Sequence, residues 1–502
     1  MKRVGLVLVA LCMLVVATPS ALANDSAVGT QGAAVRPIGD TDIRMDSEAV
    51  QIVCMRGYAL YRVDFKFVNA SDAEKAIKLG FPFPDFENEE GNRGMPPAAF
   101  RAWLNGQELD VKQEPGFDSD GDAEWPVIWF TREAVFPPGE SMVTVSYLGT
   151  PDVSVMSGEL VQALGDAVAE TGGVAYYPYL VHTGAGWAGT IGKSVVRYTL
   201  AEDFNGSQVD RVMEVERGYD WIEPERTRLL GSFTKPAPNV YEWVYEEYEP
   251  TLDHDPNLAF VHSSEWSASF DPWEATAASS FLELGEYSYP AYGARDGQPS
   301  TAWAEDADGP GIGEWIEIGF GEERDVRQIR VLPGYQKRSD LFEKYNRPKT
   351  LKVEFSDGTG VDLPLADEMG IQIFTVRATA ESAKVTILEV YPGTNERDET
   401  YLSEISFSEA PMPKLSTFEA VTGIAAPTAF EEPAALAPLT AVSGGPVGPA
   451  EPEDTEEETT GPESSASQSA PYLSAIVALG LLTAAAVIVG VRKRKPPEAT
   501  GQ

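Results

Sequence analysis

The stretch Glu314-Trp315-Ile316-Glu317-Ile318-Gly319-Phe320 alternates apolar and polar residues, which puts Ile316, Ile318 and Phe320 on one face of an extended chain. Alternation with a period of two predicts a half-buried β-strand. The same pattern returns several times towards the C-terminus, and it predicts strands at 326–332, 351–355, 384–390 and 402–407.

Towards the N-terminus the same alternation continues. Residues 61–68 place Tyr, Val, Phe and Phe opposite charged residues, and Asn105-Gly106 inside 100–111 is a strong hairpin signal. Only 158–170 suits a helix. Many short strands separated by turn residues predict an all-β chain with an N-terminal β-sandwich-like domain at 41–265 and a second β domain at 267–410. The same alternation predicts further N-terminal strands at 142–147, 194–200 and 241–245.

The two ends of the chain predict export and anchoring. Residues 1–23 have a basic start, a short apolar core and a small-residue cleavage site, which is typical of a secretory signal peptide. Residues 472–491 are uncharged and long enough to span a bilayer, and the basic tail 492–502 follows them. We therefore expect a single-pass protein of the cell membrane, with its N-terminal ectodomain outside and one C-terminal transmembrane helix.

Composition narrows the classes of partner. The 502 residues carry 38 Lys and Arg against 78 Asp and Glu, a formal net charge of −40. Such a surface repels phosphate backbones, so no nucleic-acid partner is expected. Of the two cysteines, one lies in the signal peptide, and Cys54 is expected to be a buried small apolar residue.

Two segments have too little apolar surface to form a core. Residues 24–40 are rich in Gly and Ala, and we expect them to be a loose N-terminal segment. Residues 411–471 are rich in Pro, Glu and Thr, and their prolines and charges predict an extended stalk before the membrane helix.

Several motifs could carry chemistry, and each has a plainer interpretation. Gly184-Ala185-Gly186-Trp187-Ala188-Gly189 has the spacing of a nucleotide-binding loop, but a strand rather than a helix is predicted after it, which favours a tight turn. Asp118-Ser119-Asp120-Gly121-Asp122 begins like a calcium loop, but its twelfth position is Trp129. Asp253-His254-Asp255 could bind a metal or form a polar turn. No nucleophile–base pattern with recognisable spacing is present.

The C-terminal block carries a series of motifs in a recognisable order: Ala294-Arg295-Asp296-Gly297-Gln298-Pro299-Ser300-Thr301-Ala302-Trp303, Gly313 to Ile318, Gly334 to Lys337, Tyr345 to Lys349, Phe355 to Gly358, Val390 to Gly393 and Leu402 to Phe407. On these residues, the block resembles a discoidin-like (F5/8 type C, galactose-binding-like) jelly roll. It is more closely similar to the glycan-binding domain attached to secreted bacterial NAD glycohydrolases. The NAD-cleaving domain itself is not visible in this sequence.

The N-terminal block resembles an uncharacterised family of exported bacterial β-rich domains. The resemblance rests on 63–69, 79–82 and 183–192. That family implies no known chemistry.

The discoidin resemblance implies a structural calcium ion under the Asp-Gly loop, held by that loop and by a Glu of the last strand. The matching residues are Asp296, Thr301 and Glu404. The plainer alternative is a turn in which Asp296 caps backbone amides.

The long connection Pro333 to Lys349 is the candidate ligand site, because connections of this length are commonly functional. It holds a local group of basic residues, which could attract acidic sugars or an acidic partner. Tyr335 and Tyr345 can stack on a sugar ring, while Asn346 and Arg347 can supply directed hydrogen bonds. In the alternative, the tyrosines plug the end of the sandwich and Arg347 pairs with an acidic neighbour.

These observations predict a membrane-anchored surface protein that binds an extracellular glycan or glycoprotein, in non-catalytic adhesion or recognition. Two alternatives stay open. The chain could be a surface enzyme with an active site in 41–265 that the discoidin-like block delivers to its substrate, or it could be a structural envelope protein.

Overall fold

The computed structural model describes most of the two predicted β domains. The described residues are 26–27, 32–33, 36–38, 41–55, 57–84, 97–120, 123–150, 152–155, 173–201, 209–214, 233–251, 254, 256–262, 276–285, 287–395 and 397–433. The signal peptide, the helix at 158–170, Asp253 and Asp255, and the segments 472–491 and 492–502 lie outside these residues. Within the described part of the chain, no helix is long and apolar enough to span a bilayer.

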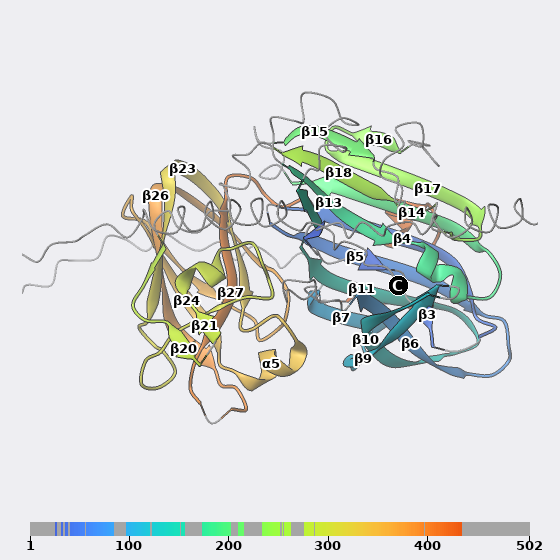
Figure 1. Ribbon diagram of the computed structural model, residues 1–502, viewed down its shortest axis with the longest axis horizontal. Helices are drawn as coiled ribbons and strands as arrows, with labels where there is room; N and C mark the ends of the chain where they lie inside the picture. Colours follow the sequence, from blue (N-terminus) through green and yellow to red (C-terminus); the bar gives the residue numbers. More distant parts are fainter. Residues whose placement is uncertain are drawn as a thin grey trace, which may run out of the picture. The chain divides into compact units, whose positions relative to one another are not determined.

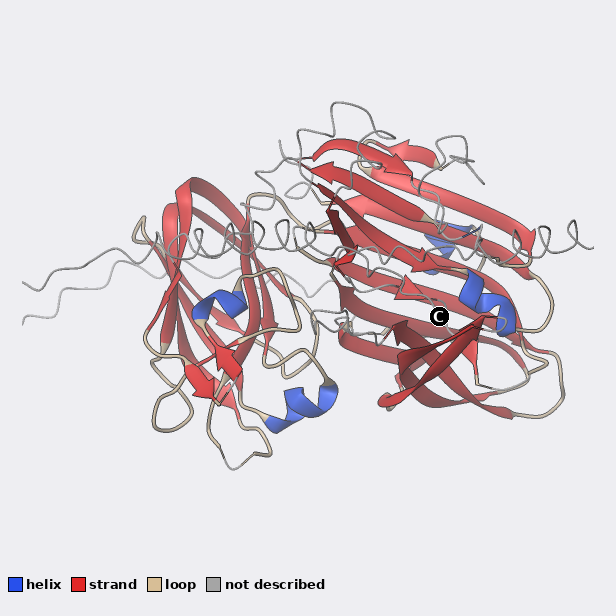
Figure 2. Ribbon diagram, in the orientation of Figure 1, coloured by secondary structure: helices blue, strands red, loops and turns tan. Residues whose placement is uncertain are grey.

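The chain is all-β, as its alternating pattern predicts (Figure 2). Across the described residues, the α-helices are α5 (Ser339–Lys344) and α6 (Phe418–Thr422), and both are short. Every other regular element described is a strand or a 3-10 turn.

An eight-stranded sheet forms one layer of the N-terminal block (Figure 1). Its two central strands, β4 and β5, pair antiparallel, whereas β14 joins β4 in parallel. In spatial order the strands are β16 (Thr234–Ala237), β17 (Val240–Tyr248), β14 (Ile191–Leu200), β4 (Arg44–Cys54), β5 (Ala59–Asn69), β11 (Gly139–Gly149), β7 (Ala98–Leu104) and β8 (Gln107–Glu108).

Two smaller sheets form the opposite layer of this block. The first has four strands in the order β3 (Arg36–Pro37), β6 (Lys75–Pro84), β10 (Ala123–Phe136) and β9 (Lys112–Asp120). The second has the order β1 (Ser26–Ala27), β12 (Asp152–Val155), β13 (Gly173–Leu180), β18 (Asn257–His262) and β15 (Val209–Glu214), with β2 (Gly32–Ala33) beside β13.

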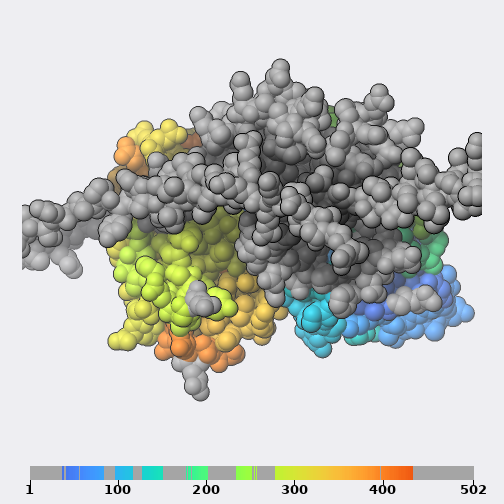
Figure 3. Space-filling model, in the orientation of Figure 1, coloured from blue at the N-terminus to red at the C-terminus, as the bar shows by residue number. Residues whose placement is uncertain are grey.

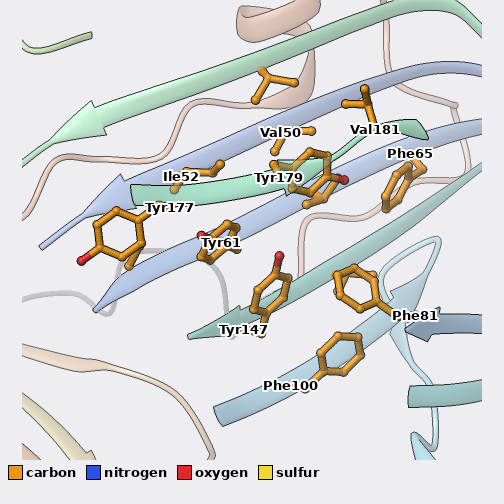
Figure 4. Packing of buried hydrophobic residues seen from close by; sticks show 14 of the residues in the cluster. Val50, Ile52, Tyr61, Phe65, Phe81, Phe100, Tyr147, Tyr177, Tyr179 and Val181 are labelled. Atoms are coloured by element: carbon orange, nitrogen blue, oxygen red, sulfur yellow. The ribbon is translucent and has the colours of Figure 1, made fainter. Parts of the chain in front are cut away.

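The core of the N-terminal block lies between these layers and is rich in aromatic rings (Figure 4). Tyr61 and Phe65 of β5 contribute to the same apolar cluster as Phe81 of β6 and Tyr179 of β13. The alternation read from 61–68 sorts the strand into a core face and an outer face. The prediction of a half-buried strand is wrong, however, because Arg62, Asp64 and Lys66 on the outer face are also buried. At Asn105-Gly106 both residues adopt positive φ, 50° and 89°, as the predicted hairpin turn requires.

The C-terminal block is built on a seven-stranded sheet that fits a jelly roll. Ile316, Ile318 and Phe320 all lie in its core, as the opening stretch predicts. The strands, in spatial order, are β22 (Trp303–Ala304), β27 (Tyr401–Ser408), β23 (Trp315–Pro333), β26 (Gln372–Tyr391), β24 (Arg347–Phe355) and β25 (Gly360–Pro364), with β19 (Thr276–Ala278) beside β23.

Residues 411–433 differ from the expected extended stalk. They contain α6, which begins at an N-cap formed by Thr417 and ends at Gly423 in the left-handed conformation. Phe418 of this segment is 1% exposed, because it packs into a cluster on the outer face of the eight-stranded sheet. Two hydrogen bonds of 2.7 and 2.8 Å join Ser416 to the side chain of Gln51. The stalk prediction is therefore wrong for 411–433, and it stays a prediction for the residues beyond.

The other motifs follow their plainer interpretations wherever they are described. The glycine-rich stretch forms the 3-10 turn η1 (His182–Gly186), and strand β14 follows it. Trp187 packs 4.2 Å from Phe67, ring centre to ring centre. Cys54 is a buried free thiol, as expected. Residues 118–120 belong to strand β9 rather than to a calcium loop.

Candidate functional site

Four tyrosines gather at one end of the C-terminal block. The ring of Tyr335 stacks on that of Tyr401 at 5.3 Å and 10°, and Tyr345 lies 4.4 Å from Tyr401. Tyr289 meets Tyr401 edge-on at 5.2 Å. We call these four residues the tyrosine cluster. Since aromatic pairs with this geometry stabilise one another, the cluster forms a rigid platform.

Three structural elements bring the cluster together, and Tyr401 is the first residue of one of them, β27. Tyr289 comes from the hairpin formed by β20 (Leu282–Leu284) and β21 (Tyr287–Tyr289), while Tyr335 and Tyr345 flank α5 in the long connection after β23. Figure 1 shows the hairpin and α5 at the same end of the block. Ring contacts therefore hold the platform together across segments that lie up to 112 positions apart, from Tyr289 to Tyr401.

The cluster continues into an exposed aromatic surface. Tyr287 is two residues from Tyr289 on the same strand, so both side chains point to the same face of the hairpin. Tyr287 is 71% exposed, the highest value among the large apolar and aromatic residues described. The hairpin lies on the face that Figure 3 presents, in yellow-green. The sequence signal for this surface is Tyr287-Ser288-Tyr289, and neither tyrosine is among the predicted glycan-binding residues.

Basic side chains border the tyrosine cluster. The Lys344 ammonium lies 5.1 Å from the centre of the Tyr345 ring. Lys337 is half-buried, and its pKa is lowered by desolvation and then by the charge of Arg338. Arg338 forms a two-pronged ion pair with Asp340. Lys337 and Lys344 therefore lie at the edge of the tyrosine cluster and make no ion pair among the described residues.

Burial distinguishes the four predicted glycan-binding residues. Tyr345 is half-buried and borders solvent, whereas Tyr335 is 8% exposed and lies mostly inside the cluster. Desolvation, followed by its tyrosine neighbours, raises the pKa of Tyr335, so its phenol stays protonated. Asn346 and Arg347 are 5% and 7% exposed.

The polar atoms of Asn346 and Arg347 bond within the fold. The Asn346 amide donates to the Asp398 carbonyl at 2.6 Å and accepts from the Gly393 amide at 2.8 Å. Arg347 donates to both carboxylate oxygens of Asp367 and, through Nη1, to the carbonyl of Phe342 at 2.9 Å. These two side chains thus hold the connection in place, which is the alternative that the sequence left open for Arg347.

The predicted calcium residues do lie together. Thr301 Oγ1 is 2.8 and 2.9 Å from the two carboxylate oxygens of Asp296, 2.8 Å from the Gln298 carbonyl and 3.2 Å from the Gly293 carbonyl. A hydroxyl has one proton, so it cannot donate to four oxygens at once. The turn is therefore an oxygen-rich cage.

Glu404 of β27 adds a second carboxylate to this turn. It is 2% exposed, and its Oε2 has no hydrogen-bond partner among the described residues. Burial and then the charge of Asp296 raise its pKa well above the usual range, and desolvation raises the pKa of Asp296 to about 7. Two facing carboxylates and several carbonyls fit a hard cation such as Ca²⁺. In the described part of the chain, no site brings together three His, Cys, Asp or Glu side chains.

This block resembles the discoidin-like domains of the F5/8 type C class. Residues 268–408 match the family model of the NAD glycohydrolase translocation F5/8 type C domain, which confirms the resemblance read from the motifs. Residues 23–116 match a domain of unknown function, DUF4424. The chain matches none of the curated protein sequences to which it was compared.

Similar solved structures include three bacterial proteins. The NAD+-glycohydrolase translocation domain of Streptococcus pyogenes is 22% identical, with a TM-score of 0.18 and coverage of 22% of this chain and 97% of that chain. The family 32 carbohydrate-binding module of C. perfringens NanJ, solved with galactose, is 18% identical, with a TM-score of 0.20 and coverage of 26% and 91%. A putative nutrient binding protein from Legionella pneumophila is 18% identical, with a TM-score of 0.36 and coverage of 50% and 78%.

Proposed function

We propose that the protein is a membrane-anchored surface protein that binds glycans through its discoidin-like domain, without catalysing a reaction. The observation that carries this proposal is the aromatic surface formed by Tyr287, Tyr289 and Tyr345 on a packed tyrosine base. Sugar rings present apolar C–H faces, and these pack on flat aromatic rings. A jelly roll holds such rings rigidly at one end of its sandwich.

Asn346 and Arg347 are buried beneath this site and support it through hydrogen bonds within the fold. Their hydrogen bonds fix the part of the connection that carries Tyr345, so the ring is already positioned before a ligand arrives. Preorganisation of this kind lowers the entropy cost of binding. We assign the two residues a positioning role, and we assign ligand contact to the tyrosines.

A calcium ion at Asp296, Thr301 and Glu404 would stabilise the domain. It would neutralise two carboxylates that otherwise repel each other, and it would join the Asp-Gly loop to the last strand. When bound, the ion supplies charge and coordination only. The ion would then hold the turn and β27 together, although they lie near opposite ends of the domain sequence.

Two experiments test this proposal. A glycan array probed with the full chain in calcium should show binding to a defined set of sugars, and the absence of any bound glycan would count against the function. Protease added to intact cells should release the folded ectodomain if residues 24–471 face outward, because exposed backbone is cleaved first. Resistance of the whole ectodomain in intact cells, but not in lysed cells, would reverse the orientation.

A further inference from the structure

The connection beside the tyrosine cluster has a charge opposite to that of the whole chain. Residues 333–349 hold five basic and two acidic side chains, a formal charge of +3, whereas the 502 residues together carry −40. Exposed aromatic rings and a local excess of positive charge therefore occur at the same end of the block. The basic residues are Lys337, Arg338, Lys344, Arg347 and Lys349, and the acidic ones are Asp340 and Glu343.

Ion pairs within the block neutralise three of these five basic side chains. Lys337 and Lys344 make no ion pair among the described residues, so their positive charges stay uncompensated. Glu399, an acidic residue whose charge reaches Tyr401, is itself paired with Arg397 at 3.3 Å. The three pairs of the connection are Arg338 with Asp340, Arg347 with Asp367 and Lys349 with Glu389.

Helix α5 directs Lys344 towards the cluster. Leu341 packs against the apolar cluster that contains Tyr335, and Lys344 follows Leu341 by three residues, which places both on one face of the helix. The Lys344 ammonium accordingly lies 5.1 Å from the centre of the Tyr345 ring. Glu343 follows Leu341 by two residues, so it belongs to another face. The helix therefore presents an ammonium group to Tyr345 and turns its carboxylate away.

The hairpin β20–β21 also turns its acidic residue away from the exposed rings. Tyr289 lies opposite Leu282 in register, and both pack in the same apolar cluster. Tyr287 lies opposite Leu284 and shares this face of the hairpin. Glu283 alternates with the two leucines, so it lies on the other face. The hairpin therefore adds no carboxylate to the face that carries the tyrosines.

The second lysine, Lys337, lies near the same tyrosines. Desolvation and neighbouring phenols raise the pKa of Tyr335, and the charge of Arg338 opposes that rise. Desolvation lowers the pKa of Lys337, and the charge of Arg338 lowers it further. Both groups therefore lie within electrostatic reach of one guanidinium. A half-buried ammonium without an acidic partner gains from a nearby anion, because the anion offsets part of the lost hydration.

We propose that the bound glycan is anionic, with a carboxylate or a sulfate group at Lys344 and Lys337 and a sugar ring on the exposed tyrosines. This specificity rests on the proposed glycan binding and names the class of sugar. An ammonium attracts either oxyanion as a point charge. Since Tyr287 is 71% exposed and Lys344 is exposed as well, the sugar lies on an open surface and needs no cavity.

Binding of the full chain to an array of neutral and anionic glycans tests this specificity. The array includes three pairs that differ in their negative groups: sialyllactose and its methyl ester, trigalacturonic acid and its methyl ester, and galactose sulfate and galactose. In at least one pair the anionic member should bind at least about fivefold more tightly at about 0.15 M salt, where a Debye length of about 8 Å screens the distant carboxylates of the chain. At about 1 M salt the difference should shrink, because the Debye length falls to about 3 Å.

Substitutions identify the groups that read the charge. Lys344→Met keeps an apolar side chain beside Tyr345 and should reduce the difference within the pair by at least about threefold, as should Lys337→Met. Lys349→Met is the matched control, because Lys349 belongs to the same connection but pairs with Glu389 at 2.6 Å. Tyr345→Ala should instead weaken the anionic and the neutral member alike.

Two results would overturn the specificity and leave the glycan function intact. One is binding of the full chain to neutral glycans as tightly as to their anionic counterparts. The other is a preference for the anionic member that persists undiminished in Lys344→Met and Lys337→Met. The absence of binding to every glycan on the array would instead count against the glycan function itself.

Discussion

Arg347 holds Asp367 with two parallel hydrogen bonds, with Nε 2.5 Å from Oδ1 and Nη2 2.9 Å from Oδ2. The two residues are 20 positions apart, and the pair joins the start of β24 to the connection after β25. The same guanidinium also donates to the carbonyls of Phe342 and Tyr345. One buried side chain therefore holds the segment that displays the candidate ligand-binding ring.

Replacing Arg347 with Ala should lower the free energy of unfolding by about 2 kcal/mol, because several buried hydrogen bonds are lost together. Arg338→Ala is the matched control, since Arg338 makes the same kind of two-pronged pair with Asp340 at the surface and should cost about 1 kcal/mol or less. Urea denaturation measures both. Equal losses for the two variants would show that Arg347 is not a structural brace.

Calcium should raise the Tm of the full chain, and a chelator should reverse the effect. Glu404→Gln should remove the response, whereas Asp357→Asn should keep it, because Asp357 sits in an ordinary turn where it accepts from Thr359. With the pKa of Asp296 at about 7, protons compete with the cation, so binding should weaken as the pH falls below 7. A Tm that ignores both calcium and chelator would rule out the ion.

Glu48 should make the N-terminal block less stable as the pH rises. Its Oε1 accepts from Ser194 at 2.6 Å and from Tyr248 at 3.3 Å, its Oε2 has no partner among the described residues, and Tyr179 is a further neighbour. Burial, only partly opposed by the two hydrogen bonds, raises its pKa from 4.5 to about 7. As the pH rises, Glu48 therefore loses its proton at a lower pH in the unfolded state than in the folded state.

The sign follows from that difference. The stabilising contribution of neutral Glu48 is fully present below about pH 4.5 and is lost as the pH rises to about 7 and beyond, a change of order 3 kcal/mol. In Glu48→Gln, stability should therefore fall less between pH 5 and pH 8 than in the unchanged protein. Glu133→Gln, at an exposed position of β10, is the control. Identical pH profiles for Glu48→Gln and the unchanged protein would refute this assignment.

Phe418 should anchor the segment 411–433 to the N-terminal block. It packs with Ala49, Met142 and Val195, so Phe418→Ala should lower the free energy of unfolding by about 3 kcal/mol. Limited proteolysis should cut within 411–433 faster in this variant than in the unchanged protein, where the segment is protected. The substitution of exposed Glu419 by Ala is the control. Equal cleavage rates in all three proteins would mean that the contact contributes little.

The strands were predictable because their chemistry is local. Ile316, Ile318 and Phe320 show the period of two within a few residues, and Asn105-Gly106 carries its turn in its own backbone preferences. The docking of 411–433 was not predictable in this way. Its few apolar residues, such as Phe418, look insufficient until the outer face that receives them is known.

The candidate site was likewise predictable only in part. The motif order placed Asp296, Thr301 and Glu404 together, although the chain separates the first and last by about 100 residues. The burial of Arg347 depends on Asp367, a partner that one sequence cannot identify among many acidic residues. The sequence alone does not distinguish a tyrosine with an exposed side chain, such as Tyr287, from a buried one, such as Tyr401.

The central claim is that the exposed tyrosines bind glycan, and the affinity of the full chain for an array-identified glycan tests it most directly. Calorimetry should be done on Tyr287→Ala and Tyr345→Ala, with Val135→Ala as a control, because Val135 is 48% exposed on β10 of the other block. We predict that each tyrosine variant weakens binding at least about tenfold, a loss of about 1.4 kcal/mol, and that Tyr287→Ala does so at unchanged Tm because Tyr287 is 71% exposed. Unchanged affinity in both tyrosine variants would contradict the account.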